Sequence, residues 1–348
     1  MRHFALLVLC SLVGIVVGCD NSSSTPSGGT ASTQASGSSG SSASGGTKTI
    51  AVIPKGTTHE FWKSIHAGAN KAAQEMGCEI IWKGPLKEDD SASQIAVVED
   101  MLNSGVSGIV LAPNDENALA RIVDRASGKL PVVIIDSDVK TQNYKSFVAT
   151  DNRKGGEIGG AHLAKLLNGK GKVIMLRYQE GSASTQNREQ GFLDEMKKHP
   201  EIQLVSVNQY SGATSDSAQK AAENLLAAQR GADGGLAIDG IFTPNEPTTA
   251  GMLMALKGAK AEGKVKFVGF DASEKLVTGL KAGQIHGLVL QDPVNMGYLG
   301  VKTMMQVLNG ATVEKRIDTG VHLATPENIE SQEIKDLVNP PLEKYGVK

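Results

Sequence analysis

Short apolar runs alternate with longer stretches of mixed polarity from Thr49 to about Asn309. The runs have the length of buried strands, and the stretches between them repeat their apolar residues at helical spacing. The first series predicts strand 49–54, helix 59–76, strand 79–83, helix 90–104, strand 107–112, helix 116–127, strand 131–135 and strand 146–150. The second predicts helix 153–168, strand 172–177, helix 185–198, strand 202–208, helix 215–229, strand 238–243, helix 246–257, strand 265–270, helix 273–282, strand 285–290 and helix 294–309.

This alternation predicts an α/β fold. Strands separated by helices form parallel, doubly wound sheets with right-handed crossovers. About 300 residues follow Lys48, which is enough for two domains by the usual size of a single core. We therefore expect two α/β units of the same construction in tandem.

Most of the apolar runs break off at a hydrogen-bonding side chain. The residues concerned are Lys55, Asp136, Asn245, Asp271 and Gln291, and Arg188 comes shortly after another run. Open parallel sheets bind ligands at the carboxyl ends of their strands. A crevice lined by these groups suits a polar, neutral small molecule.

The first residues predict export. Met1-Arg2-His3 is basic, and an apolar run from Phe4 to Val17 follows it, as in a secretory signal peptide over residues 1–18. Val16-Val17-Gly18-Cys19 resembles the bacterial lipobox, which implies that Cys19 is lipidated and anchors the protein to a membrane. An ordinary signal peptide with a chance cysteine is the alternative. Whether the membrane would be the inner or the outer one stays open.

Residues 19–48 predict a disordered tether behind the lipidated cysteine. After Asp20 they are mostly Ser, Gly, Thr and Ala, with no aromatic or large aliphatic residue to bury. Such a chain spans roughly 5–6 Å times the square root of its residue number, or about 30 Å. The folded part is therefore expected to start near Thr49.

Charge and motifs exclude several classes of function. The net charge of −2 gives no basic face for nucleic acid, and the histidines show no metal-ligand spacing. Nucleophile-elbow, phosphate-loop and dinucleotide-binding motifs do not occur, so we expect neither an enzyme nor a cofactor. With Cys10 removed and Cys19 lipidated, Cys78 has no cysteine left for an intramolecular disulfide.

Several spaced motifs resemble one family. They are Thr49–Lys55 with Phe61-Trp62, Val132–Asp138, Val148–Asn152 with Gly155-Gly156, Arg188–Phe192, Phe242–Glu246, Val268–Asp271 and Gln291–Pro293. In this order they look like the periplasmic sugar-binding proteins of ABC importers, of the ribose-binding type, over about 49–320.

The resemblance implies two Rossmann-like lobes joined by a three-segment hinge, which close over the ligand. It places the N-terminal lobe at 49–150 plus 292–320 and the C-terminal lobe at 151–291 plus 321–345. It also implies a monomer on the periplasmic or extracytoplasmic side of a membrane, and an ABC permease as partner.

The chemistry of the candidate ligand-binding residues fits a sugar. Carboxylates such as Asp136 and Asp271 accept from adjacent hydroxyls, and a guanidinium such as Arg188 donates in a fork. Amides such as Asn245 and Gln291 do both. An aromatic ring can cover a C–H face of the sugar, and we expect only one of Phe61 and Trp62 to do so, with the other in the core. The remaining candidates are Lys55 and His59.

Each candidate also has a structural explanation. An aspartate at a strand end can cap a helix, and a helical arginine next to a glutamate commonly forms a solvated ion pair. Lys55 and His59 stand where the ribose pattern has smaller polar residues, and Ala112-Pro113 and Ser137 replace two of its hydrogen-bonding residues. Another sugar is therefore favoured over ribose. The alternative is a protein that binds autoinducer-2 or a sugar derivative and serves a sensor or receptor, because Lys55 and Asp136-Ser137-Asp138 also resemble that branch.

Overall fold

The computed structural model describes residues 46–347. The predicted signal peptide 1–18, Cys19 and nearly all of the tether 19–48 lie outside the described residues.

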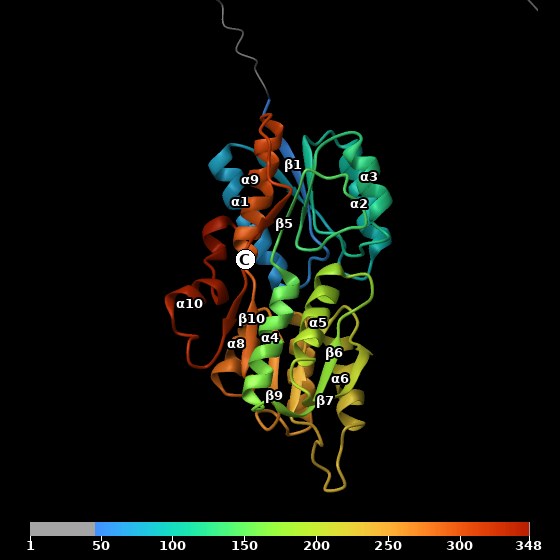
Figure 1. The fold of residues 1–348 in the computed structure, drawn as a ribbon. Helices are drawn as coiled ribbons and strands as arrows, with labels where there is room; N and C mark the ends of the chain where they lie inside the picture. The colour runs from blue at the N-terminus through green and yellow to red at the C-terminus, as the bar shows by residue number, and fades with distance from the viewer. Residues whose placement is uncertain (1–45, 348) are drawn as a thin grey trace, which may run out of the picture. The chain divides into compact units, whose positions relative to one another are not determined.

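The first sheet holds six parallel strands in the order β11-β5-β4-β3-β1-β2 (Figure 1). They are β1 (Thr49–Ile53), β2 (Glu79–Trp82), β3 (Gly108–Leu111), β4 (Val132–Ile135), β5 (Ser146–Ala149) and β11 (Arg316–Asp318). Its helices are α1 (Glu60–Met76), α2 (Ser91–Asn103), α3 (Ala120–Ser127) and α9 (Pro293–Leu308). We call this sheet with its helices the first lobe.

The second sheet repeats this plan in the order β12-β10-β9-β8-β6-β7. Its strands are β6 (Lys170–Arg177), β7 (Glu201–Tyr210), β8 (Gly240–Phe242), β9 (Lys266–Phe270), β10 (Gly287–Leu290) and the antiparallel β12 (His322–Ala324). Its helices are α4 (Asn152–Leu166), α5 (Ala183–Met196), α6 (Ser215–Ala227), α7 (Glu246–Gly258) and α8 (Glu274–Lys281), and they complete the second lobe. Helix α10 (Gln332–Val338) and the 3₁₀-helix η1 (Leu342–Tyr345) end the chain.

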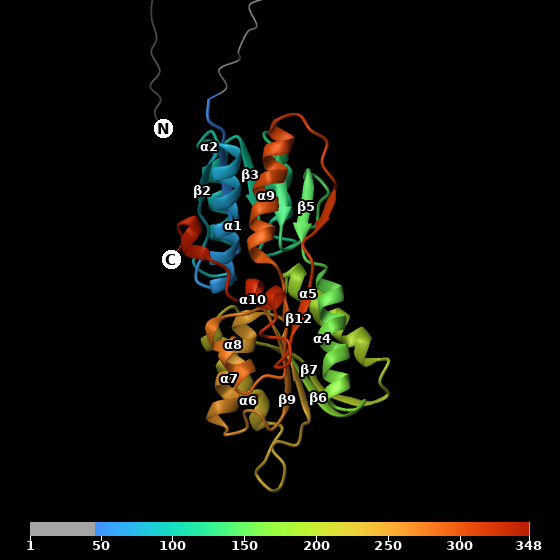
Figure 2. The ribbon, with the colours of Figure 1, turned by 90° about the vertical axis from the view of Figure 1, so that its left-hand side faces the viewer.

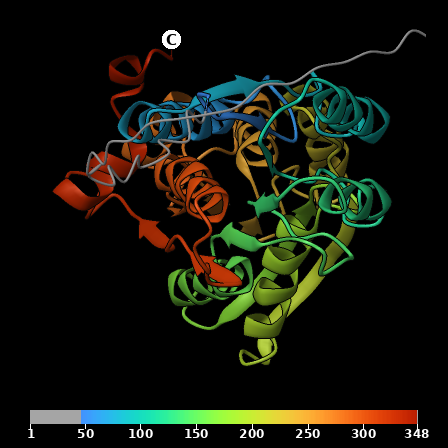
Figure 3. The ribbon, with the colours of Figure 1, turned by 90° about the horizontal axis from the view of Figure 1, so that it is seen from above.

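Both faces of each sheet are covered by helices. Along β1, Ile50 and Val52 belong to the core beneath α1 and α9, whereas Ala51 and Ile53 belong to the core beneath α2 and α3. Figure 3 shows these two helix pairs on opposite sides of the sheet. A strand buried on both faces needs apolar residues at successive positions, which is why the sequence shows short continuous runs.

Glycine pairs bring two helices of each lobe unusually close together. A Cβ atom at Gly68 of α1 or Gly297 of α9 would overlap the backbone of the facing helix. The same holds for Gly156 of α4 and Gly191 of α5, and the atom that Gly156 faces is the Arg188 carbonyl oxygen. The α4–α5 contact therefore fixes the part of α5 that carries Arg188.

The predicted fold class is confirmed. The chain passes from one sheet to the other between β5 and α4, between β10 and α9, and between β11 and β12, where Gly320 has a φ of 85°. Helix α3 starts at Ala120 instead of 116, because the Asp115 carboxylate accepts from the backbone N–H groups of the next turn.

The end of the chain departs from the sequence analysis. β11, β12, α10 and η1 were not among the predicted elements. Residues 321–345 were assigned to the C-terminal lobe, and this boundary stays a prediction; η1, within that range, contacts α1 of the first lobe.

Candidate functional site

The nine predicted ligand-binding residues line one cavity between the carboxyl ends of the two sheets. They are Lys55, His59, Phe61, Trp62, Asp136, Arg188, Asn245, Asp271 and Gln291. Five further residues line it, namely Glu88, Ser184, Thr185, Glu246 and Pro247. The geometry brings the nine together, and their part in binding stays a prediction.

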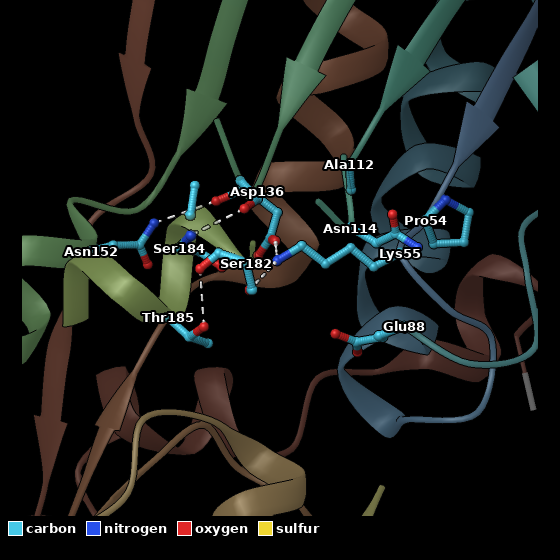
Figure 4. Close-up of polar contacts among 12 residues, drawn as sticks. Pro54, Lys55, Glu88, Ala112, Asn114, Asp136, Asn152, Ser182, Ser184 and Thr185 are labelled. Atoms are coloured by element: carbon cyan, nitrogen blue, oxygen red, sulfur yellow. Dashed lines mark hydrogen bonds and ion pairs between the residues drawn. The ribbon is translucent and has the colours of Figure 1, made fainter. Parts of the chain in front are cut away.

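Lys55 reaches across the cavity from the first lobe to the second. It follows β1 after Pro54, and its Nζ lies 2.8 Å from Asp136 Oδ2 and donates to Ser184 Oγ of α5 at 2.9 Å. Figure 4 shows the extended side chain with Asp136 and Ser184 around its end. Lys55 and Asp136 are each 3% exposed, so each charge depends on the other in place of water. This ion pair occupies the centre of the candidate site.

Asp271 holds the corresponding place in the second lobe. It follows β9, accepts from Gln291 Nε2 at 2.7 Å and from the Glu246 backbone N–H at 3.1 Å, and lies 3.6 Å from Arg188 Nη1. Burial raises the pKa of Asp271, although the Arg188 charge and these hydrogen bonds oppose the rise. The carboxylate therefore sits among donors that a hydroxylated ligand could share.

Arg188 is buried and is not a solvated side chain. Its Nε donates to Asn152 Oδ1 at 2.8 Å, its Nη1 donates to the Pro244 carbonyl at 3.0 Å, and its guanidinium lies 4.0 Å from the centre of the Phe270 ring. The neighbouring Glu189 pairs with Arg177 instead, at 2.7 Å. The expected alternative of an Arg188–Glu189 surface pair is therefore wrong.

The two aromatic candidates contact each other edge to face. Their ring centres are 5.1 Å apart at an angle of 86°, and Trp62 is buried while Phe61 is partly exposed. Trp62 Nε1 donates to Glu88 Oε1 at 2.8 Å, which anchors the indole in the wall. Of the two, Phe61 has the freer face for a C–H surface.

Glu88 is a central residue that the sequence analysis missed. Besides Trp62, its carboxylate bonds to His59 Nδ1 at 2.7 Å and accepts from Tyr178 OH of the second lobe at 3.0 Å. Burial alone would raise the pKa of Glu88, but the bond and charge of His59, the charge of Lys55 and the Trp62 bond lower it to about 2. Glu88 lies in the acidic run before α2, which resembles an ordinary helix start, so no sequence signal marked it.

Glu246 is the second missed acid. It is the first residue of α7, after the N-cap Asn245, whose side chain accepts from the Thr248 N–H. Burial raises its pKa to about 7, with the Asp271, Glu60 and Glu88 charges adding to the rise and His59 opposing it. The pKa of His59 is itself raised: burial lowers it, but the bond and charge of Glu88 outweigh that effect.

The cavity is small in this conformation, at about 30 Å³. That is the volume of one liquid water, whereas ligand pockets commonly hold 300–1,000 Å³. A cavity of about 690 Å³ adjoins it and shares Phe61, Asp271 and Gln291 as lining residues. A ligand larger than a water molecule would need the lobes to separate, or Lys55 to withdraw, before it reached Asp136.

Within residues 46–347, no helix combines the length and apolarity that a bilayer crossing needs. No group of three or more histidine, cysteine or acidic side chains in this range is arranged to hold a metal ion.

Comparison with known proteins agrees with this architecture. A family model described as "Periplasmic binding protein domain" matches residues 50–312. The ribose import binding protein of Haemophilus influenzae is 30% identical over 270 residues, which cover 77% of this chain and 88% of that protein.

Two solved structures have the same fold. A carbohydrate transporter solute-binding protein of Agrobacterium radiobacter, in complex with D-arabinose, is 33% identical with a TM-score of 0.80, covering 84% of this chain and 99% of that one. An ABC transporter solute-binding protein of Agrobacterium vitis, with bound D-fucose, is 35% identical with a TM-score of 0.78, covering 83% and 99%. The two-lobe architecture and the resemblance inferred from the motifs are confirmed, and the chain belongs to the periplasmic binding protein family.

Proposed function

We propose that this protein captures a small neutral carbohydrate between its two lobes and delivers it to an ABC-type importer. The observation that carries the proposal is that Asp136, Asp271, Arg188 and the other predicted residues, drawn from both sheets, line one cavity. The Haemophilus influenzae relative is named for ribose import, and two similar structures hold D-arabinose and D-fucose. They are binding proteins of transport systems, which supports a role without catalysis.

The balance of charge supports a neutral ligand. Three basic side chains line the cavity, Lys55, His59 and Arg188. Four carboxyl groups also line it, from Glu88, Asp136, Glu246 and Asp271, and protonation of one of them near neutral pH brings the two signs close to balance. A strongly charged ligand would leave buried charge uncompensated, whereas hydroxyl groups can donate to the carboxylates and accept from the cations.

The mechanism follows from the two-lobe arrangement. Lys55 and Asp136 belong to the first lobe, and Arg188 and Asp271 to the second, so a ligand can bond to both sets only when the lobes are closed. Binding would then shift an open–closed equilibrium about the three crossings. The permease would recognise the closed pair of lobes.

Titration calorimetry with pentoses and hexoses tests the proposal. We expect at least one of D-arabinose, D-ribose, D-fucose and D-allose to bind, and Asp271→Asn to weaken that binding at least tenfold, because a charge-assisted hydrogen bond contributes about 1.5–3 kcal/mol. Asp216→Asn, on an exposed position of α6, is the matched control. Equal affinity in wild type and Asp271→Asn would show that the site is elsewhere.

One observation favours a second candidate. The buried Lys55–Asp136 pair at 2.8 Å lies inside the cavity and joins the two residues that resemble the autoinducer-2-binding branch. A ligand of that kind would serve a sensor or receptor. Thermal shifts measured with autoinducer-2 beside the four sugars distinguish the candidates, since a ligand that binds only the folded state raises its stability.

We also propose that the mature protein is a monomeric lipoprotein, anchored at the extracytoplasmic face of a membrane through Cys19 and held off it by residues 20–48. The lipobox-like motif before Cys19 supports this. Mass spectrometry should find acyl chains on Cys19 of the membrane fraction, and Cys19→Ser should release the protein from that fraction. Retention of the serine variant on the membrane would contradict the anchor.

A further inference from the structure

The C-terminal segment is first fixed to the second lobe. Ile329 and Ile334 are each 4% exposed and belong to the core that contains Leu288 of β10. On the surface, Lys281 of α8 pairs with Glu330 at 2.8 Å. These contacts hold α10 against the second lobe.

The chain then returns to the first lobe. The 3₁₀-helix η1 contacts α1, and Asn70 Nδ2 of α1 donates to the Tyr345 carbonyl oxygen at 2.8 Å. Lys71 Nζ lies 5.9 Å from the centre of the Tyr345 ring, and Val347 is buried. Figure 2 shows the chain end beside α1 and α10 close to α8. We call residues 339–347 the strap, because they connect α10 on one lobe to α1 on the other.

The linker within the strap is short. Three residues, Asn339, Pro340 and Pro341, separate α10 from η1, and the two prolines have a fixed φ. Four steps of at most 3.3–3.6 Å lead from Val338 to Leu342, a reach of about 14 Å. The lobes can move apart at this point by no more than that reach allows, unless η1 leaves α1.

The strap also lies over the cleft. Pro340 and Leu342 line the cavity of about 690 Å³, whose other walls include Phe61, Asp271 and Gln291 of the inner cavity. Separation of the lobes on this side would therefore stretch the strap. The three crossings already described lie at β5–α4, β10–α9 and β11–β12, so the strap is a tie additional to them.

We propose that the strap is a fourth connection that limits how far the two lobes open. With η1 docked, opening on the α1–α8 side is restricted, and wide opening requires η1 to detach from α1. The inference concerns the protein without ligand, so it does not depend on which sugar binds.

Lengthening the strap tests this directly. Six residues, Gly-Ser-Gly-Ser-Gly-Ser, are inserted between Asn339 and Pro340 of the full chain, which leaves the η1 contacts with α1 in place. Probes are attached through p-acetylphenylalanine at exposed positions 129 and 257, one in each lobe, so that no cysteine needs to be changed. Single-molecule energy transfer then measures the distribution of probe distances in the absence of sugar.

We expect the insertion to add a longer-distance population, at least threefold above its wild-type share. The same insertion between Gly234 and Gly235, in an exposed loop of the second lobe, should leave the distribution unchanged. Asn70→Ala, which removes the hydrogen bond to Tyr345, is a milder second variant and should shift the distribution in the same direction. Wild-type distributions in both the insertion variant and Asn70→Ala would overturn the proposal. A shift in a protein that binds no sugar would leave it intact and count against the proposed function alone.

Discussion

Replacing Glu246 by glutamine should stabilise the protein, and the gain should grow with pH. The pKa of this buried carboxyl is raised from 4.5 to about 7, chiefly by burial. Between these pH values the unfolded chain has lost the proton that the folded protein keeps. The contribution of this group to the free energy of unfolding is therefore fully present below pH 4.5 and is lost as the pH rises through about 7.

The magnitude follows from the difference between the two pKa values. The two pKa values differ by roughly 2.5, and each pKa unit corresponds to about 1.36 kcal/mol. Ionised Glu246 therefore lowers the free energy of unfolding of the wild type by about 3 kcal/mol above pH 8. Glutamine has nearly the shape of the protonated acid and cannot ionise. We expect Glu246→Gln to match wild type at pH 4.5 and to be more stable by up to about 3 kcal/mol at pH 8. The charge of His59, which opposes the rise, is already included in the pKa of about 7.

Urea unfolding, followed by tryptophan fluorescence at pH 4.5, 6, 7 and 8, measures the difference. With a slope of about 3 kcal/mol per molar urea, the midpoints should diverge by about 1 M at pH 8. Glu274→Gln is the matched control, because Glu274 is likewise the first residue of a second-lobe helix but is exposed. A difference between Glu246→Gln and wild type that stays constant from pH 4.5 to 8 would refute the reasoning.

Three further perturbations test the packing and the charges. Gly156→Ala should destabilise by about 1–3 kcal/mol in thermal unfolding because its Cβ would overlap the facing helix, whereas Gly258→Ala, with open space around it, should be neutral or slightly stabilising. Lys55→Met should cost about 3 kcal/mol at pH 7 by leaving the Asp136 charge buried and unpaired, and an unchanged urea midpoint would contradict a buried pair. The depressed pKa of Glu88 means that its carboxylate stabilises the folded protein above about pH 4.5, and that this contribution is lost as the pH falls through about 2. Glu88→Gln should therefore be less stable than wild type above about pH 4.5, and much of the wild-type loss of stability between about pH 4.5 and 2 should be absent in the variant.

Most of the fold was predictable because its strands are buried on both faces. Such strands need continuous apolar runs, and the helices between them carry an apolar stripe, so both periods are visible in the sequence. The missed elements lack these signals. β11 and β12 have three residues each, and α10 owes its position to contacts such as that of Ile334 with the second-lobe core, which no local pattern shows.

The candidate site was predictable where it follows the strand ends, and not where it depends on contacts from a loop. Asp136 and Asp271 follow directly on apolar runs, so their meeting at the cleft follows from the topology. Glu88 reaches the cleft from a loop, through its bonds to Trp62 and Tyr178. Its place depends on how the two lobes face each other, which is information that a single sequence does not carry.

The two aspartates of the candidate site lie at equivalent positions of the two lobes. β4 and β9 occupy the same place in their sheets, and Asp136 and Asp271 follow them with φ values of 62° and 66°. In each case the backbone N–H donates to the next strand, to Val148 O at 3.1 Å and to Val289 O at 2.7 Å.

A left-handed backbone favours glycine, and a side chain there costs free energy that must be offset by what the side chain does. Neither aspartate is the N-cap residue of a helix, since the N-caps nearby are Asn245 and Ser273, although Asp271 does accept from the first backbone N–H of α7, that of Glu246. Each of the two carboxylates lies beside its own buried cation at the cavity wall, Asp136 beside Lys55 and Asp271 beside Arg188. Equivalent positions in two lobes thus present a carboxylate beside a donor, an arrangement that can hold hydroxyl groups from both sides at once.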